Sequence, residues 1–444
     1  MGASVPLQGL KREISPETPD FLASTRWSFS IFCISYKERM FTAHRKLPLL
    51  ALLMSAILMW SGCFNSSPPS GLTNTSFVWV ATQGDQMVRT FTISLEDGQI
   101  FPVGNNGNPV PTGVQPMQMA STPDGSTLFL ANAGGTVTAY TVGKDGSLTA
   151  AGSPVSAGQN PVALAVDPTG KLLFVANQGT LSDATSGTIS VFSISGANLT
   201  EVTGSPFATE IAGDTSGSGP SALAVAPAGN YLYVANKFTN TVESFSFNSS
   251  DALTLIGSYN AGVAPAGMAF SRCAGISAAA PTATCPAADS DSLFVANSGS
   301  NDISIFSACI QVSANCTTPD GTLSQISGSP VTAGVGPATI VVNPAANFVY
   351  VVDEGSSQIS EYTYKPASGA LTALGSASCG TSAFAGSITS NVSNTTTTSN
   401  WMAVSNNGAA SLSVFRVAAT DGKLNALSSG QYSVQGQPSA ILMR

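Results

Sequence analysis

PVALAVDPTGKLLFVANQG, from Pro161 to Gly179, decides the fold because the chain repeats it. Close copies run PSALAVAPAGNYLYVANKF from Pro220 and PMQMASTPDGSTLFLANAG from Pro116, and weaker copies begin at Pro265 and Pro337. Repeats of roughly 40–50 residues that are rich in short strands are typical of β-propeller blades. One blade cannot bury both faces of its small sheet, whereas a ring of blades can.

Each repeat carries four strand signals, which the copy beginning at Pro161 shows clearly. We predict strands over Val162–Val166, Leu172–Ala176, Thr188–Ser193 and Leu199–Thr203. The first two are nearly continuous apolar runs, as expected of strands buried on both faces, and the third alternates. A turn sequence, Asp167–Gly170, separates the first two strands.

The number of blades follows from the two ends of the repeat region. A degenerate copy begins near Ala385, with strands expected over Trp401–Ser405 and Ser411–Arg416. The first copy has strand signals at Phe77–Ala81, Met87–Ser94 and Ile100–Val103 but lacks an inner strand, and Pro438–Arg444 resembles the missing one. We therefore predict an all-β, seven-bladed β-propeller over residues 76–444, with four-stranded blades and a first blade closed by the C-terminal strand.

The N-terminal part reads as a targeting segment. Residues 40–62, MFTAHRKLPLLALLMSAILMWSG, place basic residues before the apolar stretch Leu47–Trp60. That stretch is shorter than the about 20 residues of a membrane span and suits a signal peptide. The following Cys63 makes it resemble a bacterial lipoprotein signal, with Cys63 lipidated; a plain secretory signal cut nearby is the alternative. Residues 63–75 would be a tether, and residues 1–39 a non-native or disordered extension.

Charge and cysteine content point to a cell-envelope protein. The chain has 24 acidic against 16 basic residues, and only 9% of its residues are charged, which argues against nucleic-acid binding. Cys273 and Cys285 flank one insertion, Cys309 and Cys316 flank another, and each pair can form a disulfide in an oxidising compartment. We expect a monomer that is lipid-anchored to a bacterial membrane or secreted to the periplasm or exterior, and that touches the membrane only through its lipid.

Histidine is nearly absent, which limits the chemistry. His44, the single histidine, lies within the predicted signal peptide. A Ser-His-Asp triad, a histidine base and a histidine-ligated metal are therefore excluded from the mature protein. Catalysis would use carboxylates, Lys, Arg, Tyr or a carboxylate-bound cation. We expect no cofactor and no metal; a divalent cation in the channel is compatible with the sequence, but no motif indicates one.

Polar residues end the second strand of most repeats. In a propeller the loops after this strand surround the central channel on one face, so these side chains should form a ring. The ring comprises Asn132, Asn177, Asn236, Asn297, Asp353 and Asn406. It would bind sugar hydroxyls or a lactone carbonyl; the structural alternative is that each asparagine caps a turn.

Departures from the repeat suggest where catalysis occurs. Asp353 and Glu354 replace the usual residues, and Lys237 follows Asn236. With Asp85 and Arg89 of the first blade, they would form a charged cluster at the channel mouth that activates a water or polarises a carbonyl. The alternative is a solvated rim without catalytic function.

The phrase P-x-A-L-A-V-x-P-x-G-x-x-L-Y-V-A-N, with a trailing Gly-Ser-Pro, resembles the YVTN-type repeats of lactonase-family seven-bladed propellers. The resemblance covers roughly residues 77–444. The family includes 6-phosphogluconolactonases and many secreted bacterial relatives. It implies the propeller fold and hydrolysis of a sugar lactone. We therefore hold two hypotheses: an extracytoplasmic lactonase-like hydrolase acting on a small sugar lactone, or a non-catalytic scaffold that binds an envelope glycan or protein.

Overall fold

The computed structural model describes residues 75–104, 107–209, 216–248, 252–271, 291–313, 316–388 and 400–444. The chain divides into two units, Met1–Gly62 and Cys63–Arg444, and the described residues belong to the second. The predicted signal peptide, Cys63, most of the tether, Cys273 and Cys285 lie outside them. All regular elements in the described ranges are strands. These ranges contain no helix that is long and apolar enough to cross a membrane.

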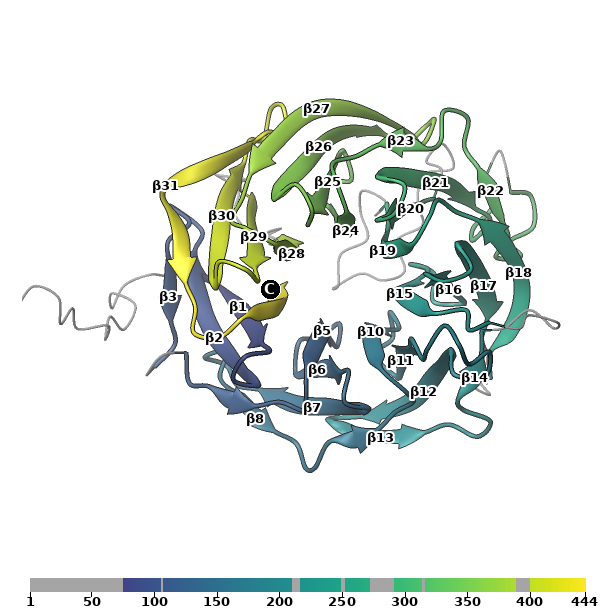
Figure 1. Ribbon diagram of the computed structural model, residues 1–444, viewed down its shortest axis with the longest axis horizontal. Coiled ribbons are helices and arrows are strands. Elements are labelled where there is room, and N and C mark those ends of the chain that lie inside the picture. Colours follow the sequence, from purple (N-terminus) through teal and green to yellow (C-terminus); the bar gives the residue numbers. More distant parts are fainter. Residues whose placement is uncertain are drawn as a thin grey trace, which may run out of the picture. The chain divides into compact units, whose positions relative to one another are not determined.

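The second unit consists of seven antiparallel sheets, the blades, placed around a common axis (Figure 1). From inner to outer strand, blade one contains β32 (Pro438–Met443), β1 (Thr75–Thr82), β2 (Met87–Ser94) and β3 (Ile100–Pro102), with β4 (Val110–Pro111) also on β2. Blade two contains β5 (Pro116–Ser121), β6 (Thr127–Asn132), β7 (Thr136–Val142) and β8 (Leu148–Ala150), with β9 (Val155–Ser156) on β7. Blade three contains β10 (Pro161–Val166), β11 (Leu172–Asn177), β12 (Thr188–Ser195) and β13 (Asn198–Glu201), with β14 (Phe207–Ala208) on β12.

The remaining blades repeat this order. Blade four contains β15 (Pro220–Val225), β16 (Tyr231–Asn236), β17 (Thr241–Ser246) and β18 (Thr254–Asn260). Blade five contains β19 (Pro265–Phe270), β20 (Ser292–Asn297), β21 (Asp302–Ala308) and β22 (Leu323–Gln325), with β23 (Val331–Thr332) on β21. Blade six contains β24 (Pro337–Val342), β25 (Phe348–Asp353), β26 (Gln358–Lys365) and β27 (Ala370–Ser378). Blade seven contains β28 (Ala383–Ile388), β29 (Asn400–Asn406), β30 (Ser411–Val417) and β31 (Leu424–Ser433).

The predicted ring closure is confirmed. β32 pairs antiparallel with β1 and completes blade one. The inner strands contact one another in the order β32, β5, β10, β15, β19, β24, β28 and back to β32. The hydroxyl of Ser439 donates to the carbonyl of Pro116 at 2.6 Å, and the guanidinium of Arg444 donates to the carbonyl of Thr122 at 2.7 Å. The last strand therefore protects the edge of blade one and fastens it to blade two.

Burial explains why the ring is needed. The described residues form seven hydrophobic clusters, and each draws its main members from two neighbouring blades. Aromatic residues of second strands also reach the outer turn of the next blade: Trp79 donates to the carbonyl of Gly146 and Tyr233 to that of Gly321, both at 3.0 Å. Each apolar blade face is thus covered by its neighbour, and the polar tips of these rings are satisfied.

One predicted disulfide lies within the described residues and is confirmed. Cys309 and Cys316 are bonded and close a short loop between β21 and β22 of blade five. Cys379 is a partly buried free cysteine, and burial raises the pKa of its thiol to about 11. The thiol is therefore protonated near neutral pH, as expected of a small apolar residue rather than a nucleophile.

Candidate functional site

Every blade brings two loop positions together at its inner end. The first residue of the inner strand pairs with the last residue of the second strand, as Pro116 does with Asn132. We call the residue before the inner strand and the residue after the second strand, in all seven blades, the rim. In each blade the N–H of the later position donates to the carbonyl of the earlier one at 2.7–3.0 Å. These bonds join Gln83 to Gln437, Ala133 to Gln115, Gln178 to Asn160, Lys237 to Gly219, Ser298 to Ala264, Glu354 to Gly336 and Asn407 to Ser382.

The ring of asparagines lies just beneath the rim, inside the blades. Asn132, Asn177, Asn236, Asn297 and Asn406 each have no exposed surface. Their amide groups donate to hydroxyls on the third strand of the same blade, as from Asn177 to Ser190 at 3.0 Å and from Asn406 to Ser413 at 2.9 Å. These contacts favour the structural alternative, in which the asparagine fastens the end of its blade; a ligand-binding role for the ring stays a prediction.

Glycines make this arrangement possible, and the sequence analysis missed them. Gly158 and Gly380 lie three residues before their inner strands, and each donates its N–H to the asparagine side-chain oxygen of its blade at 3.1 Å. A Cβ on Gly158 would lie 2.6 Å from Cγ of Asn177. Gly113, Gly262 and Gly334 lie equally close to Asn132, Asn297 and Asp353 of their blades. The recurrence of glycine three residues before the inner-strand proline of blades two to six was the available signal.

Asp353 occupies the asparagine position in blade six and is fully buried. Its Oδ2 accepts bonds from the N–H of Ser360 at 3.1 Å and from its hydroxyl at 2.6 Å, and the backbone N–H of Gly334 also contributes. Oδ1 has no hydrogen-bond partner among the residues that the structure describes. Burial raises the pKa of Asp353 to about 6, and the hydrogen bonds only partly offset that rise. The carboxyl is therefore enclosed in its blade, and its predicted catalytic role stays a prediction.

Lys237 and Glu354 do reach the rim, in different blades. Both side chains are exposed, and their backbone N–H groups hold equivalent places in blades four and six. Blade five separates them along the ring, and no ion pair joins them in the part of the chain that the structure describes. The structure therefore places these two charges in different blades, without an ion pair among the described residues, and places Asp85 and Arg89 in a third blade.

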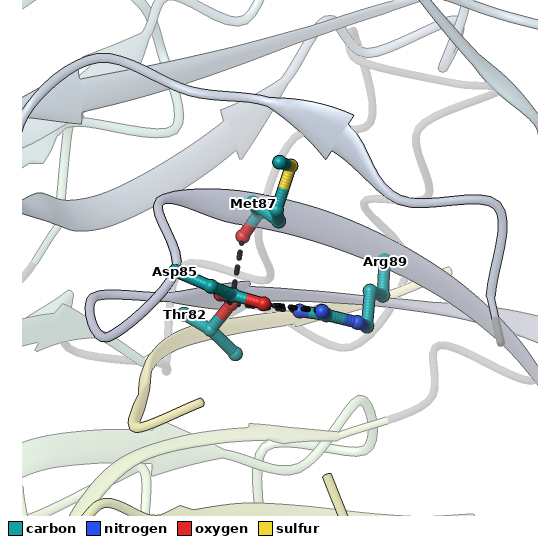
Figure 2. Close-up of polar contacts among 4 residues, drawn as sticks. All are labelled: Thr82, Asp85, Met87 and Arg89. Atoms are coloured by element: carbon teal, nitrogen blue, oxygen red, sulfur yellow. Dashed lines mark hydrogen bonds and ion pairs between the residues drawn. The ribbon is translucent and has the colours of Figure 1, made fainter. Parts of the chain in front are cut away.

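Asp85 and Arg89 are brought together in blade one (Figure 2). Arg89 is 3% exposed, forms an ion pair with Asp85 and donates to the hydroxyl of Thr82 at 2.9 Å. Thr82 in turn donates to Asp85 at 2.5 Å. Burial raises the pKa of Asp85, but hydrogen bonds from Arg89 and Thr82 outweigh it and hold that pKa below its usual range. Thr82 and Arg89 occupy the strand positions that Asn177 and Ser190 hold in blade three. The hydrogen bond between Arg89 and Thr82 therefore replaces the amide–hydroxyl contact of the other blades.

These features define a seven-bladed β-propeller in which polar contacts close the inner end of each blade. The sequence model of the family described as lactonase, 7-bladed β-propeller, matches residues 73–205, 185–307 and 283–438. The chain belongs to this family.

Solved structures agree on the fold. The Pseudomonas aeruginosa periplasmic gluconolactonase PpgL has 18% identity and a TM-score of 0.64, with 83% of this chain and 99% of that one covered. A "putative 6-phosphogluconolactonase" from Bacteroides fragilis has 18% identity and a TM-score of 0.63, with 85% and 99% covered. A similarly named protein from Bacteroides uniformis has 16% identity and a TM-score of 0.62, with 84% and 100% covered. No curated protein sequence matches this chain.

Proposed function

We propose that this protein is a lactone hydrolase that acts outside the cytoplasm on an unphosphorylated sugar lactone. The low charge of the rim is the observation that favours an unphosphorylated substrate. Lys237 and Glu354 are the only charged side chains at the rim positions, all of which are described, and Gln, Asn and Ser fill most other places. Binding a phosphate strongly takes several Arg or Lys side chains, whereas amides suit neutral hydroxyls.

The two rim charges provide complementary chemistry for ester hydrolysis. Water attacks the lactone carbonyl, the ring C–O bond breaks, and the ring oxygen leaves as a hydroxyl, which yields a hydroxy acid. Glu354 takes the proton of the attacking water and returns it to the ring oxygen as the C–O bond breaks. Lys237 donates a hydrogen bond to the carbonyl oxygen as negative charge develops on it. Both side chains are exposed and so have access to a ligand at the rim.

Two features support the extracytoplasmic location. The segment ending at Cys63 has the pattern of a lipoprotein signal. The Cys309–Cys316 disulfide is of a kind that persists in oxidising compartments. Metabolic labelling with a fatty acid tests the anchor: the parent should be labelled and recovered with membranes, and Cys63→Ser should be neither.

Hydrolysis of neutral lactones tests the activity. Purified mature protein should hydrolyse D-glucono-1,5-lactone faster than the spontaneous rate in a pH-stat, and faster than it hydrolyses the 6-phosphorylated lactone. Glu354→Gln should lower kcat about 10²-fold, in keeping with loss of a general base. Lys237→Met should also lower it. Glu96→Gln and Lys144→Met, which change exposed charges in outer turns, are the matched controls and should keep full activity. Variants at 237 and 354 as fast as the parent would remove these two residues from the mechanism.

A non-catalytic binding scaffold is the second candidate. The enclosure of Asp353, one of three predicted catalytic groups, favours it, because this carboxyl has no exposed surface. This function predicts no turnover from a folded, monodisperse sample, together with recovery of an envelope glycan or protein on the immobilised propeller.

A further inference from the structure

The rim is not symmetric in its backbone hydrogen bonds. In blades five, six and seven, the N–H of the residue before the inner strand is capped by a side chain of the preceding blade. Asn240 caps Ala264 at 2.7 Å, and Asn301 caps Gly336 at 2.8 Å. Ser357 caps Ser382 at 3.2 Å in the same manner.

The same N–H groups are uncapped in blades one, two and three. Those of Gln437, Gln115 and Asn160 donate to no acceptor among the described residues. The residues that would cap the first two are Ala410, whose side chain has no acceptor, and Gln86. In blade four the N–H of Gly219 has no acceptor within the described ranges either, but Gly219 is buried.

Carboxamide side chains gather at these same blades. Gln437 and Gln83 belong to the rim of blade one, Gln115 to that of blade two, and Asn160 and Gln178 to that of blade three. Elsewhere the rim carries one carboxamide, Asn407, beside short or charged side chains. β32, β5 and β10 are successive neighbours at the axis (Figure 1), so these groups share one sector.

We infer that the rim of blades one to three is the subsite that holds the hydroxyl-bearing part of a neutral sugar-like ligand. Its backbone N–H groups donate to ligand oxygens, and its carboxamides both donate and accept, which matches the mixed character of hydroxyl groups. Lys237 of the neighbouring blade four lies at the edge of this sector. The inference rests on the proposed function for the ligand class but not on turnover.

Installing the missing caps tests the inference. Gln86 and Ala410 have φ values of 56° and 45°, close to the 60° and 58° of the capping residues Asn240 and Asn301. Asparagine tolerates this conformation. Gln86→Asn and Ala410→Asn should therefore occupy the N–H groups of Gln115 and Gln437 without altering the fold. Ser357→Asn, which replaces an existing cap by another, is the matched control.

Binding of the stable neutral analogue D-glucono-1,5-lactam, followed by calorimetry, provides the readout. Ala410→Asn, Gln115→Ala and Gln178→Ala should each weaken binding about fivefold, as expected for loss of one hydrogen bond. Ser357→Asn should bind as the parent does. The melting temperature of each cap variant should equal or exceed that of the parent.

Three results would overturn the subsite: no binding by the parent, equal binding by all variants, or an equal loss in Ser357→Asn. Lactone hydrolysis, measured separately, distinguishes this failure from failure of the proposed function. A parent that hydrolyses lactones with unchanged KM in all cap and amide variants keeps the activity and loses the subsite. A parent that binds the lactam as predicted but does not hydrolyse lactones keeps the subsite and loses the activity.

Discussion

Replacing Asp353 by asparagine should stabilise the protein, by an amount that depends on pH. Blade seven shows what the new side chain would do: Asn406 donates to the hydroxyls of Ser411 and Ser413 and accepts the N–H of Gly380. In blade six the introduced amide would find an equivalent hydroxyl in Ser360 and an equivalent N–H in the glycine three residues before β24. The substitution therefore keeps the network and removes a buried charge.

The pKa of Asp353 sets the size of the effect. The pKa is about 6 in the folded protein, against an ordinary value of 3.8 for an aspartate in the unfolded chain. Because the folded-state pKa is raised, the folded protein binds this proton more tightly than the unfolded chain. The stability linked to that proton is fully present below pH 3.8 and is lost as the pH rises through about 6. At 1.36 kcal/mol per unit, the ionised carboxyl costs about 3 kcal/mol at pH 8 and less than about 1 kcal/mol at pH 4.

Urea unfolding of the parent and of Asp353→Asn at pH 4, 6 and 8 measures this difference. The variant should be more stable by a margin that grows with pH toward about 3 kcal/mol. The reverse change, Asn406→Asp, is the matched control and should destabilise blade seven mainly above pH 6. A pH-independent difference, or a less stable Asp353→Asn, would refute the assignment of a buried carboxyl with a raised pKa. Full lactonase activity in Asp353→Asn would also remove Asp353 from the catalytic groups, whereas loss of activity with gained stability would support the original prediction.

Three further outcomes follow from the fold. Gly158→Ala should destabilise the protein by about 2 kcal/mol in urea, since its Cβ would overlap the Asn177 side chain; unchanged stability would contradict the close contact. Deleting residues 438–444 removes β32, so the shortened chain should lose its cooperative thermal transition, and a sharp transition near the parent's would mean that closure is dispensable. Reducing the Cys309–Cys316 disulfide should lower the free energy of unfolding by at most about 2.5 kcal/mol, measured in urea with and without reductant.

The repeat was enough to predict the architecture because the strands and turns of each blade are determined by residues close together in the sequence. Apolar runs and Pro-Gly turns recur with each copy, so strands such as Met87–Ser94 were located to the residue. The first repeat lacked an inner strand, and the segment Pro438–Arg444 was the one strand signal without a blade. β32, formed by this segment, supplies the inner strand of blade one. Hydrophobic period and turn chemistry therefore determine both blade number and closure.

The candidate site was harder to predict because its contacts join distant residues. The sequence placed Asp353 beside Glu354 at a channel mouth, yet the alternation of strand side chains encloses the first and exposes the second. Lys237 and Glu354 share a repeat position but lie in different blades, so sequence equivalence did not make them neighbours. Only the Asp85–Arg89 pair, whose members are four residues apart across one turn, came together as expected.

The closing contacts of the blades limit which groups of this propeller can bind a ligand. Positions beneath the rim are committed to blade closure, and even the charged substitutes at Asp353 and Arg89 make the closing contacts of their blades. A ligand must therefore be recognised by what the network leaves unused. Capping side chains accept hydrogen bonds from the rim N–H groups of blades five to seven. The N–H groups of Gln437, Gln115 and Asn160 have no acceptor among the described residues and lie beside exposed or partly exposed carboxamides. In the proposed subsite, binding specificity would arise from missing caps as much as from added side chains, because an N–H without a protein acceptor can donate to a ligand oxygen.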